Sequence, residues 1–230
     1  MRCPSELIDT NTLSNLNQSD LIIANLGLQD YQKTLHAMQH YAKTRLDAPD
    51  QIWILEHKPI FTRGARSEDC DIKSKLPHSI VDTDRGGKIT FHGPGQLIVY
   101  FLINTQGNQR LNHFINNLEQ TILNILDQLA IQAYTDKKNR GIYVDGSKIA
   151  SIGLRVKRNN TYHGFSLNVD MDLRPFEYIK PCGIEQNMTQ VVNHQPNANM
   201  VKVNDICLRE IKKQWADNQR IHYWGQYHPT

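Results

Sequence analysis

One glycine-rich stretch stands out in the sequence: Arg85-Gly86-Gly87-Lys88-Ile89-Thr90-Phe91-His92-Gly93-Pro94-Gly95-Gln96. Several glycines in so short a segment cost backbone entropy on folding, and a close approach of the backbone to a ligand explains that cost better than an ordinary hairpin. The apolar run 97–103 follows directly and is typical of a buried central strand. Taken alone, the pattern also fits a glycine-rich turn without chemistry, because isolated glycine-rich matches are weak signals.

Two further glycine-bearing segments lie downstream, Gly146-Ser147-Lys148-Ile149-Ala150-Ser151-Ile152-Gly153 and Ile179-Lys180-Pro181-Cys182-Gly183-Ile184. Each is flanked by strand-like sequence, so we predict that the three segments form three walls of one pocket. Cys182 is a candidate nucleophile and Lys148 a candidate neighbour, because a nearby ammonium lowers the pKa of a thiol and supplies the thiolate. On the residues alone, a buried structural cysteine and a surface lysine remain alternatives.

Length and composition predict one globular domain over residues 1–230, with a motif-bearing core at about 50–190. Hydrophobic residues make up 39% of the chain and charged residues 21%, as in an ordinary water-soluble protein. The longest apolar run, 97–103, is much shorter than the roughly 18 residues of a membrane-spanning helix. The first residues carry no charged region followed by an apolar one, so we expect a cytoplasmic protein without a membrane partner.

Metal and cofactor motifs are missing from the sequence. The cysteines are far apart and form no C-x-x-C pair, which argues against a zinc ribbon or a disulfide framework: Cys3, Cys70, Cys182 and Cys207. No phosphate-binding loop, dinucleotide fingerprint, H-E-x-x-H or G-x-S-x-G is present. His36 and His40 have a metal-binding spacing on an expected helix, but no third ligand is near, so we interpret them as a solvated helix surface.

The net charge of +3, from 26 basic and 23 acidic residues, is too small to indicate nucleic acid. The distribution is uneven, because basic residues gather between 137 and 158 with Asp145 as the one acid among them: Lys137, Lys138, Arg140, Lys148, Arg155, Lys157 and Arg158. Such a segment is either a solvated hairpin surface or a docking surface for an acidic macromolecule.

Hydrophobic periodicity predicts a mixed sheet packed with helices, the α+β class. A helix over about 28–42 ends before Pro49, and a long helix has a buried stripe at Leu111, Ile115, Leu118, Ile122, Ile125 and Leu129. Asp145-Gly146 predicts a tight hairpin and Asn159-Asn160 another turn. Strands are expected at 21–26, 52–56, 60–64, 96–103, 131–135, 141–144, 148–156 and 162–169, a mobile loop or lid at 65–78, a loop or short helix at 171–180, and a last helix at 205–215 before a polar tail.

Five segments taken together resemble the lipoyl(octanoyl) transferase family of lipoate biosynthesis. Besides the three already quoted, they are Trp53-Ile54-Leu55-Glu56-His57 and His163-Gly164-Phe165-Ser166-Leu167-Asn168. The match runs in order from about 53 to 184, over half of the chain, and the combined pattern is very specific. Residues 1–50 and 188–230 match no motif of the family.

This resemblance implies the fold of the biotin/lipoate protein ligase (BPL/LPL) catalytic domain. It also implies that Cys182 carries the acyl group and that Lys148 tunes the thiol. The substrate-binding positions implied by the family pattern are Arg85, Gly86, Gly87, Lys88, Ile89, Thr90, Phe91, His92, Ser151, Ile152, Gly153, Gly164, Phe165 and Ser166.

The implied reaction moves an octanoyl group from acyl carrier protein to a lysine of lipoyl domains through a thioester on Cys182. The implied acceptors are the E2 subunits of 2-oxoacid dehydrogenases and the H protein of glycine cleavage. Neither ATP nor metal is expected, because thioester exchange is nearly isoenergetic and the final amide is far more stable. Two alternatives are an ATP-dependent lipoate or biotin ligase on the same fold, which needs no cysteine nucleophile, and a non-catalytic basic binding module, against which the sparse aromatic residues near the hairpin argue.

Overall fold

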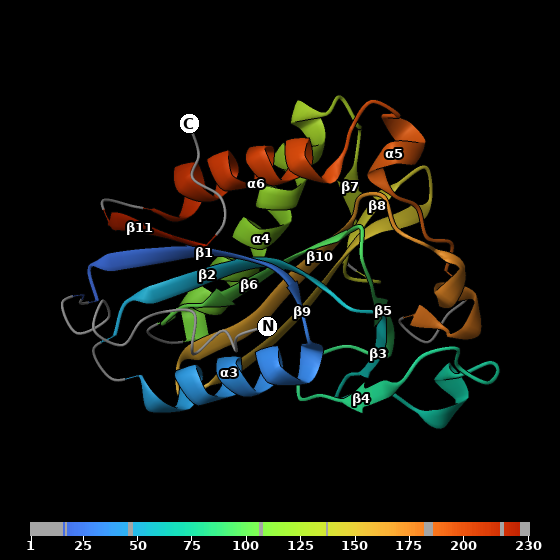
Figure 1. The fold of residues 1–230 in the computed structure, drawn as a ribbon, viewed down its shortest axis with the longest axis horizontal. Coiled ribbons are helices and arrows are strands. Elements are labelled where there is room, and N and C mark those ends of the chain that lie inside the picture. The colour runs from blue at the N-terminus through green and yellow to red at the C-terminus, as the bar shows by residue number, and fades with distance from the viewer. Residues whose placement is uncertain are drawn as a thin grey trace.

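The computed structural model describes residues 16, 18–45, 48–105, 108–136, 138–181, 186–216 and 219–225. Its main element is an eight-stranded mixed sheet in the order β11-β1-β2-β6-β10-β9-β8-β7 (Figure 1). β11, β1 and β2 run parallel, and every other neighbouring pair is antiparallel. The strands are β1 (Asp20–Gln29), β2 (Asp50–His57), β6 (Gln96–Leu102), β7 (Tyr134–Thr135), β8 (Ile142–Val144), β9 (Ser147–Lys157), β10 (Asn160–Asn168) and β11 (Arg220–Gly225).

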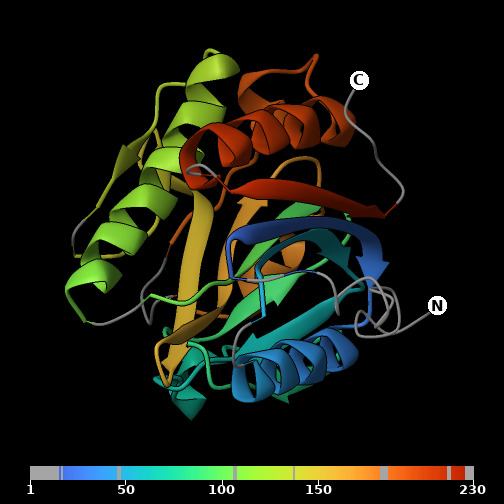
Figure 2. The same ribbon diagram turned by 90° about the vertical axis from the view of Figure 1, so that its left-hand side faces the viewer.

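Helices cover both faces of this sheet, which confirms the predicted fold class. α4 (Asn108–Gln128) and α6 (Met200–Trp215) lie on one face and α3 (Tyr31–Thr44) on the other (Figures 1 and 2). The central strand β6 is buried along its whole length, and its side chains alternate between the two layers. Val99 and Phe101 pack in the cluster with α4 and α6, whereas Ile98 and Tyr100 pack in the cluster with α3.

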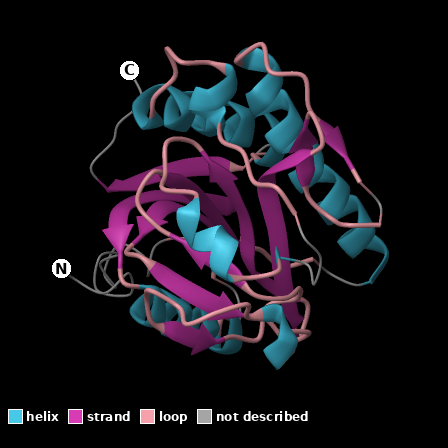
Figure 3. Ribbon diagram, turned by 90° about the vertical axis from the view of Figure 1, so that its right-hand side faces the viewer, coloured by secondary structure: helices cyan, strands magenta, loops and turns pink. Residues whose placement is uncertain are grey.

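A second, three-stranded sheet has the order β4-β3-β5 and lies beside the first, on the side of the molecule viewed in Figure 3. Its strands are β3 (Ile60–Arg63), β4 (Ile80–Asp82) and β5 (Thr90–His92). Together with the short helix η2 (Arg174–Tyr178), it buries a small core of its own that contains Phe61, Phe91 and Phe176. This small sheet holds the glycine-rich stretch between β4 and β6.

Several local predictions are confirmed. Asp145 and Gly146 form the tight turn between β8 and β9, with φ angles of 48° and 80°. His36 and His40 are exposed on α3, as expected for a solvated helix surface. The expected loop after β3 contains the short helix η1 (Asp69–Asp71) and is joined to η2 by a bridge between Ile72 and Ile179.

The C-terminal region differs from the prediction. The expected polar tail contains β11. This strand pairs in parallel with β1, which lies near the other end of the sequence. α6 begins at Met200 instead of 205, because the side chain of Asn199 accepts a hydrogen bond of 2.9 Å from Lys202 N and caps the helix. The short helix α5 (Val191–His194) was not predicted. The second turn centres on Arg158 and Asn159, one residue earlier than expected, with φ angles of 51° and 63°.

None of the helices in the described ranges is both long and apolar enough to cross a bilayer. Glu68, Cys70 and Asp71 bring three potential metal ligands together. The ammonium group of Lys88 already pairs with the two carboxylates, because its Nζ is 3.0 Å from Asp71 Oδ1 and 3.3 Å from Glu68 Oε2. These carboxylates therefore serve to hold the glycine-rich stretch.

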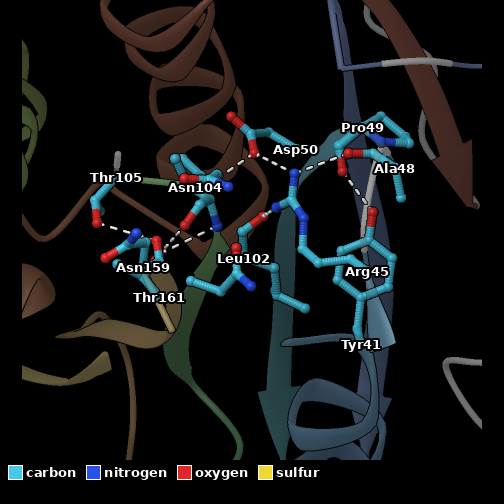
Figure 4. A network of polar contacts seen from close by, with 12 residues as sticks. Tyr41, Arg45, Ala48, Pro49, Asp50, Leu102, Asn104, Thr105, Asn159 and Thr161 are labelled. Atoms are coloured by element: carbon cyan, nitrogen blue, oxygen red, sulfur yellow. Dashed lines mark hydrogen bonds and ion pairs between the residues drawn. The ribbon is translucent and has the colours of Figure 1, made fainter. Parts of the chain in front are cut away.

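A buried ion pair joins the end of α3 to the sheet (Figure 4). Arg45 Nη2 lies 2.8 Å from Asp50 Oδ1, and the side chain of Arg45 is only 3% exposed. Nη1 of Arg45 donates to the carbonyl oxygen of Leu102 and Nη2 also donates to that of Ala48, each at 2.8 Å. Asp50 Oδ1 also accepts a bond of 3.0 Å from Asn104 N, so the pair ties β2 and the end of β6 to α3.

We predict that Arg45→Met lowers the free energy of unfolding by about 3 kcal/mol, because it leaves the partly buried Asp50 carboxylate without its partner. Lys43→Met removes a positive charge from the exposed side of the same helix and is expected to change stability by less than about 0.5 kcal/mol. Urea unfolding followed by circular dichroism measures both values. Equal midpoints for the two variants would contradict a structural role of the pair.

Candidate active site

One cavity is lined by residues of all three predicted walls. All but one of the predicted substrate-binding residues take part: Arg85, Gly86, Gly87, Lys88, Ile89, Thr90, His92, Ser151, Ile152, Gly153, Gly164, Phe165 and Ser166. Lys148 and Pro181 line the same cavity. The residue that does not line it is Phe91, whose ring packs against Phe61 at 5.1 Å and Phe176 at 5.9 Å. Because side chains alternate along a strand, Thr90 and His92 face the cavity while Phe91 faces the small core.

Cys182, the candidate nucleophile, lies outside the described residues, as do Gly183 and Ile184. The chain on both sides of it is anchored. Before it, Lys180 N donates a bond of 2.7 Å to Asp71 O. After it, the chain pairs with β9: Lys148 N donates to Asn187 O at 2.8 Å, and Thr189 N donates to Lys148 O at 2.9 Å. The segment that carries Cys182 therefore begins at a cavity residue and returns to Lys148.

The glycine-rich stretch forms its wall by close backbone contacts. Gly86 N donates to Leu154 O of β9 at 2.9 Å, and Arg66 N donates to Gly87 O at 3.1 Å. A Cβ at Gly64 would lie 2.4 Å from Gly87 O, so only glycine allows this approach. The Arg85 guanidinium is buried and donates at 2.8 Å to both the carbonyl and the hydroxyl oxygen of Thr62. Arg85 thus fixes the wall to β3.

Lys148 is only 1% exposed. Its Nζ donates to Arg140 O at 3.1 Å and lies 5.3 Å from the centre of the Tyr143 ring. Gly141 makes room for this side chain, because a Cβ there would lie 2.7 Å from Lys148 Cε and 3.0 Å from Nζ. A buried amino group without hydrogen-bond partners is unfavourable, so these contacts hold Lys148 in one position.

A chain of buried amides connects the cavity to the segment after Cys182. His92 Nδ1 lies 2.7 Å from Gln96 Oε1 and must donate to it, so the neutral ring carries its proton on Nδ1. Gln96 Nε2 donates to Asn168 Oδ1 at 2.9 Å, and Asn168 Nδ2 donates to Thr189 O at 2.9 Å. Hydrogen bonds therefore run without a break from the imidazole of His92 to the backbone of Thr189.

Sequence reasoning missed five cavity residues: Tyr31, Ile98, Tyr100, Arg140 and His163. Helical periodicity marks Tyr31 as buried, but nothing local tells that α3 places it beside His92, with the two rings stacked at 5.7 Å. His163 has a φ of 63°, which is rare for a residue other than glycine and has no signature in the sequence. The pattern of β6 shows Tyr100 as buried without showing its partner, His57 Nε2, at 2.8 Å.

Burial keeps the histidines around the cavity neutral. It lowers the pKa of His57 to about 4. Burial, together with the neighbouring His57, lowers the pKa of His92 well below its ordinary value. Burial also lowers the pKa of His163, although Asp84 acts in the opposite direction. Burial raises the pKa of Tyr100 well above its usual range. Near neutral pH, these side chains offer hydrogen-bond donors and acceptors without charge.

We predict that stability falls as the pH drops below about 6.5, because the unfolded chain then protonates histidines that the folded chain keeps neutral. The contribution of His57 is fully present above pH about 6.5 and is lost as the pH falls toward its folded pKa of about 4. The free energy of unfolding of wild type should fall between pH 7.5 and pH 5. In His57→Gln this fall should be smaller by about 1 to 2 kcal/mol.

His36→Gln, on the exposed surface of α3, is the matched control and should keep the wild-type pH dependence. Urea unfolding at each pH gives the comparison. A pH dependence that is the same in His57→Gln and wild type would show that His57 is protonated in the folded protein as readily as in the unfolded chain.

Comparison with known proteins agrees with this geometry. The family model described as the lipoyl protein ligase A/B catalytic domain matches residues 30–212. An octanoyltransferase of Shewanella frigidimarina is 47% identical over 208 residues, which is 89% of this chain and 96% of the relative. An octanoyltransferase of Buchnera aphidicola is 40% identical over 196 residues, covering 84% of this chain and 93% of the relative.

Solved structures show the same fold at low sequence identity. A lipoate-protein ligase A bound with ATP has a TM-score of 0.69 at 11% identity and covers 90% of this chain and 89% of its own. A bi-partite lipoate protein ligase from Thermoplasma acidophilum has a TM-score of 0.70 at 11% identity and covers 90% of this chain and 88% of its own. The chain therefore has the biotin/lipoate protein ligase fold, and by its sequence it belongs to the lipoyl protein ligase A/B catalytic-domain family and, within that family, to the acyltransferases known as octanoyltransferases.

Proposed function

We propose that this enzyme moves an octanoyl group from acyl carrier protein to a lysine of a lipoyl domain, through a thioester on Cys182. The observation that carries the proposal is the shared cavity of Lys148 and Pro181, the residue directly before Cys182. Apolar residues from the glycine-rich stretch and from three strands line the same cavity, which suits an acyl chain: Ile89, Ile98, Ile152 and Phe165.

The first half-reaction is a thioester exchange. The Cys182 thiolate attacks the carbonyl carbon of the donor thioester, a carbon–sulfur bond to Cys182 forms, and the bond to the donor sulfur breaks. The donor leaves as a thiolate and takes up a proton. One thioester replaces another, so the step is nearly isoenergetic and needs neither ATP nor a metal ion.

The second half-reaction forms an amide. The neutral amine of the acceptor lysine attacks the acyl carbon, a carbon–nitrogen bond forms, and the carbon–sulfur bond to Cys182 breaks. The amine gives up a proton as the thiolate leaves. An amide is much more stable than a thioester, which drives the transfer to completion. The acceptors that suit this chemistry are lipoyl domains of 2-oxoacid dehydrogenases and the H protein of glycine cleavage.

Lys148 is proposed to set the ionisation of Cys182. A charged Lys148 favours the thiolate electrostatically, and a neutral Lys148 accepts the thiol proton as a general base. In a coupled pair, both descriptions predict the same pH dependence of the thiol, because the two groups share their macroscopic pKa values. The role requires Lys148 Nζ to stay where Arg140 O and the Tyr143 ring hold it.

Incubation with octanoyl carrier protein is expected to add one octanoyl group to Cys182. Intact-protein mass spectrometry should show the added mass, and hydroxylamine should remove it because thioesters react with hydroxylamine. Cys182→Ser should not accumulate this labile adduct, whereas Cys70→Ser, at an exposed cysteine, should behave as wild type. If ATP and free octanoate are required for any transfer, the enzyme is a ligase and the proposal fails.

Gly141→Ala is expected to slow octanoyl transfer at least tenfold, because its Cβ would lie 2.7 Å from Lys148 Cε and 2.9 Å from Ala150 O and would displace the lysine side chain from its position between them. Gly146→Ala is the matched control. It introduces a side chain at another positive φ of the same hairpin, but nothing lies within 4 Å of its Cβ, so transfer should be nearly unchanged in the folded protein.

Alkylation of Cys182 across pH tests the same idea directly. The midpoint of thiol reactivity should move upward in Gly141→Ala and further upward in Lys148→Met. Identical alkylation profiles in wild type and Lys148→Met would mean that the lysine does not activate the thiol.

A further inference from the structure

A second, larger groove opens beside the site and shares part of its wall. Its volume is about 700 Å³. Five residues line both spaces: Gly86, Gly87, Lys88, Ile152 and Gly153. Arg140, whose carbonyl oxygen accepts the bond from Lys148 Nζ, also lines both. The groove therefore adjoins the Lys148 cavity along the glycine-rich stretch and β9.

The groove is strongly basic. Its cationic lining residues come from four separate parts of the chain: Arg66, Lys88, Lys138, Arg140 and Arg155. Among the described residues that line it, Asp84 is the one acid, and its carboxylate already accepts hydrogen bonds from Gln39, Tyr162 and His163. Lys88 is paired with Glu68 and Asp71, so the positive potential comes mainly from the exposed side chains of Arg66, Lys138, Arg140 and Arg155.

The groove also has an apolar side. Periodicity assigns Leu111 and Ile115 of α4 to the buried stripe of that helix, but both are only half-buried and line the groove. Their partners further along the same stripe, Leu118 and Ile122, are fully buried. Leu111 and Ile115 thus line the groove together with Leu154 and Val156 of β9, which complete an apolar surface next to the cations.

We infer that this groove binds the phosphopantetheine arm of the acyl donor, with the phosphate held by Arg66 and Lys138 and the arm lying along Leu111, Ile115 and β9 toward Lys148. The inference rests on the proposed function, because it names the part of the donor that the groove holds. A phosphate diester attracts cations, and the pantetheine chain is long, thin and partly apolar. A groove that is cationic, partly apolar and shares a wall with the Lys148 cavity suits such an arm.

Other anionic occupants fit less well. A nucleic acid needs stacking aromatic side chains beside the cations, and the described residues that line the groove include none. The triphosphate of ATP is also an anion and could bind the same cations. The experiment below distinguishes ATP from the phosphopantetheine arm as the ligand of the groove.

The test compares two donors that differ only in the phosphate, octanoyl-4′-phosphopantetheine and octanoyl-pantetheine. Wild type should use the phosphorylated donor with a kcat/KM at least tenfold higher, as expected from two charge-assisted hydrogen bonds. The double variant Arg66→Gln and Lys138→Gln should lose most of this preference and keep its rate with octanoyl-pantetheine. The matched control is Lys157→Gln with Arg158→Gln. It removes two exposed charges at the end of β9, outside the groove, and should keep the preference.

Binding of the non-acylated arm gives a readout that does not need catalysis. Calorimetry should show that 4′-phosphopantetheine binds wild type about tenfold more tightly than pantetheine, and that Arg66→Gln with Lys138→Gln abolishes the difference. If no donor is turned over but this binding pattern holds, the proposed transfer is wrong and the groove assignment stands.

Three results would overturn the assignment. The first is acyl transfer without any preference for the phosphorylated donor. The second is a preference that survives in Arg66→Gln with Lys138→Gln. The third is binding of ATP to the groove that 4′-phosphopantetheine does not displace, which would make the groove a nucleotide site.

Discussion

The backbone pairing between Lys148 and residues 187–189 is the contact on which the rest of the site depends. It uses both the N–H and the C=O of Lys148, at 2.8 and 2.9 Å, and it places the start of β9 against the chain that returns from Cys182. The pairing is possible because the Asp145-Gly146 turn sets the register of β9. One hairpin thereby fixes the position of a buried lysine relative to a loop that is distant in the sequence.

Around this contact the protein places polar groups that stay uncharged. The histidines near the cavity are neutral because burial disfavours the imidazolium, and their ring nitrogens are satisfied by Tyr100, Gln96 and Asp84. Neutral imidazoles in this wall can face an acyl chain without adding a further charge near Lys148. The amide chain from Gln96 through Asn168 to Thr189 adds rigidity, since each member is buried and paired.

The site consists of two neighbouring spaces that are lined by different kinds of residue. Lys88 and Arg140 line both spaces, but the Lys148 cavity adds the neutral rings of His92 and His163, whereas the groove adds the exposed cations Arg66, Lys138 and Arg155. An acyl thioester on a charged arm has the same asymmetry, with an apolar acyl end and an anionic distal end. The glycine-rich stretch belongs to the lining of both spaces, and its backbone passes close to β9 and to Gly64.

The sequence by itself determined the elements whose signals are local. The alternation and apolar run of β6, the Asp145-Gly146 turn and the stripe of α4 follow from nearest-neighbour sterics and the burial of one face. The three glycine-bearing segments also indicated one pocket, because glycine at close approaches leaves a readable pattern. The candidate pair Cys182 and Lys148 came from the same segments. Lys148 lies in the cavity, and the role of Cys182 stays a prediction.

Only the tertiary structure decided which elements meet. β11 was hidden in a polar tail because its stability comes from pairing with β1, some 200 residues earlier, and not from its own composition. Tyr31 and Tyr100 carry ordinary signals of burial, and the packing of α3 on the sheet turns them into cavity walls. Phe91 faces the small core because the register of β5 assigns alternate side chains to opposite sides. The half-buried end of the α4 stripe shows the same limit: periodicity tells which side of a helix is apolar, but the neighbouring elements determine how much of that side is covered.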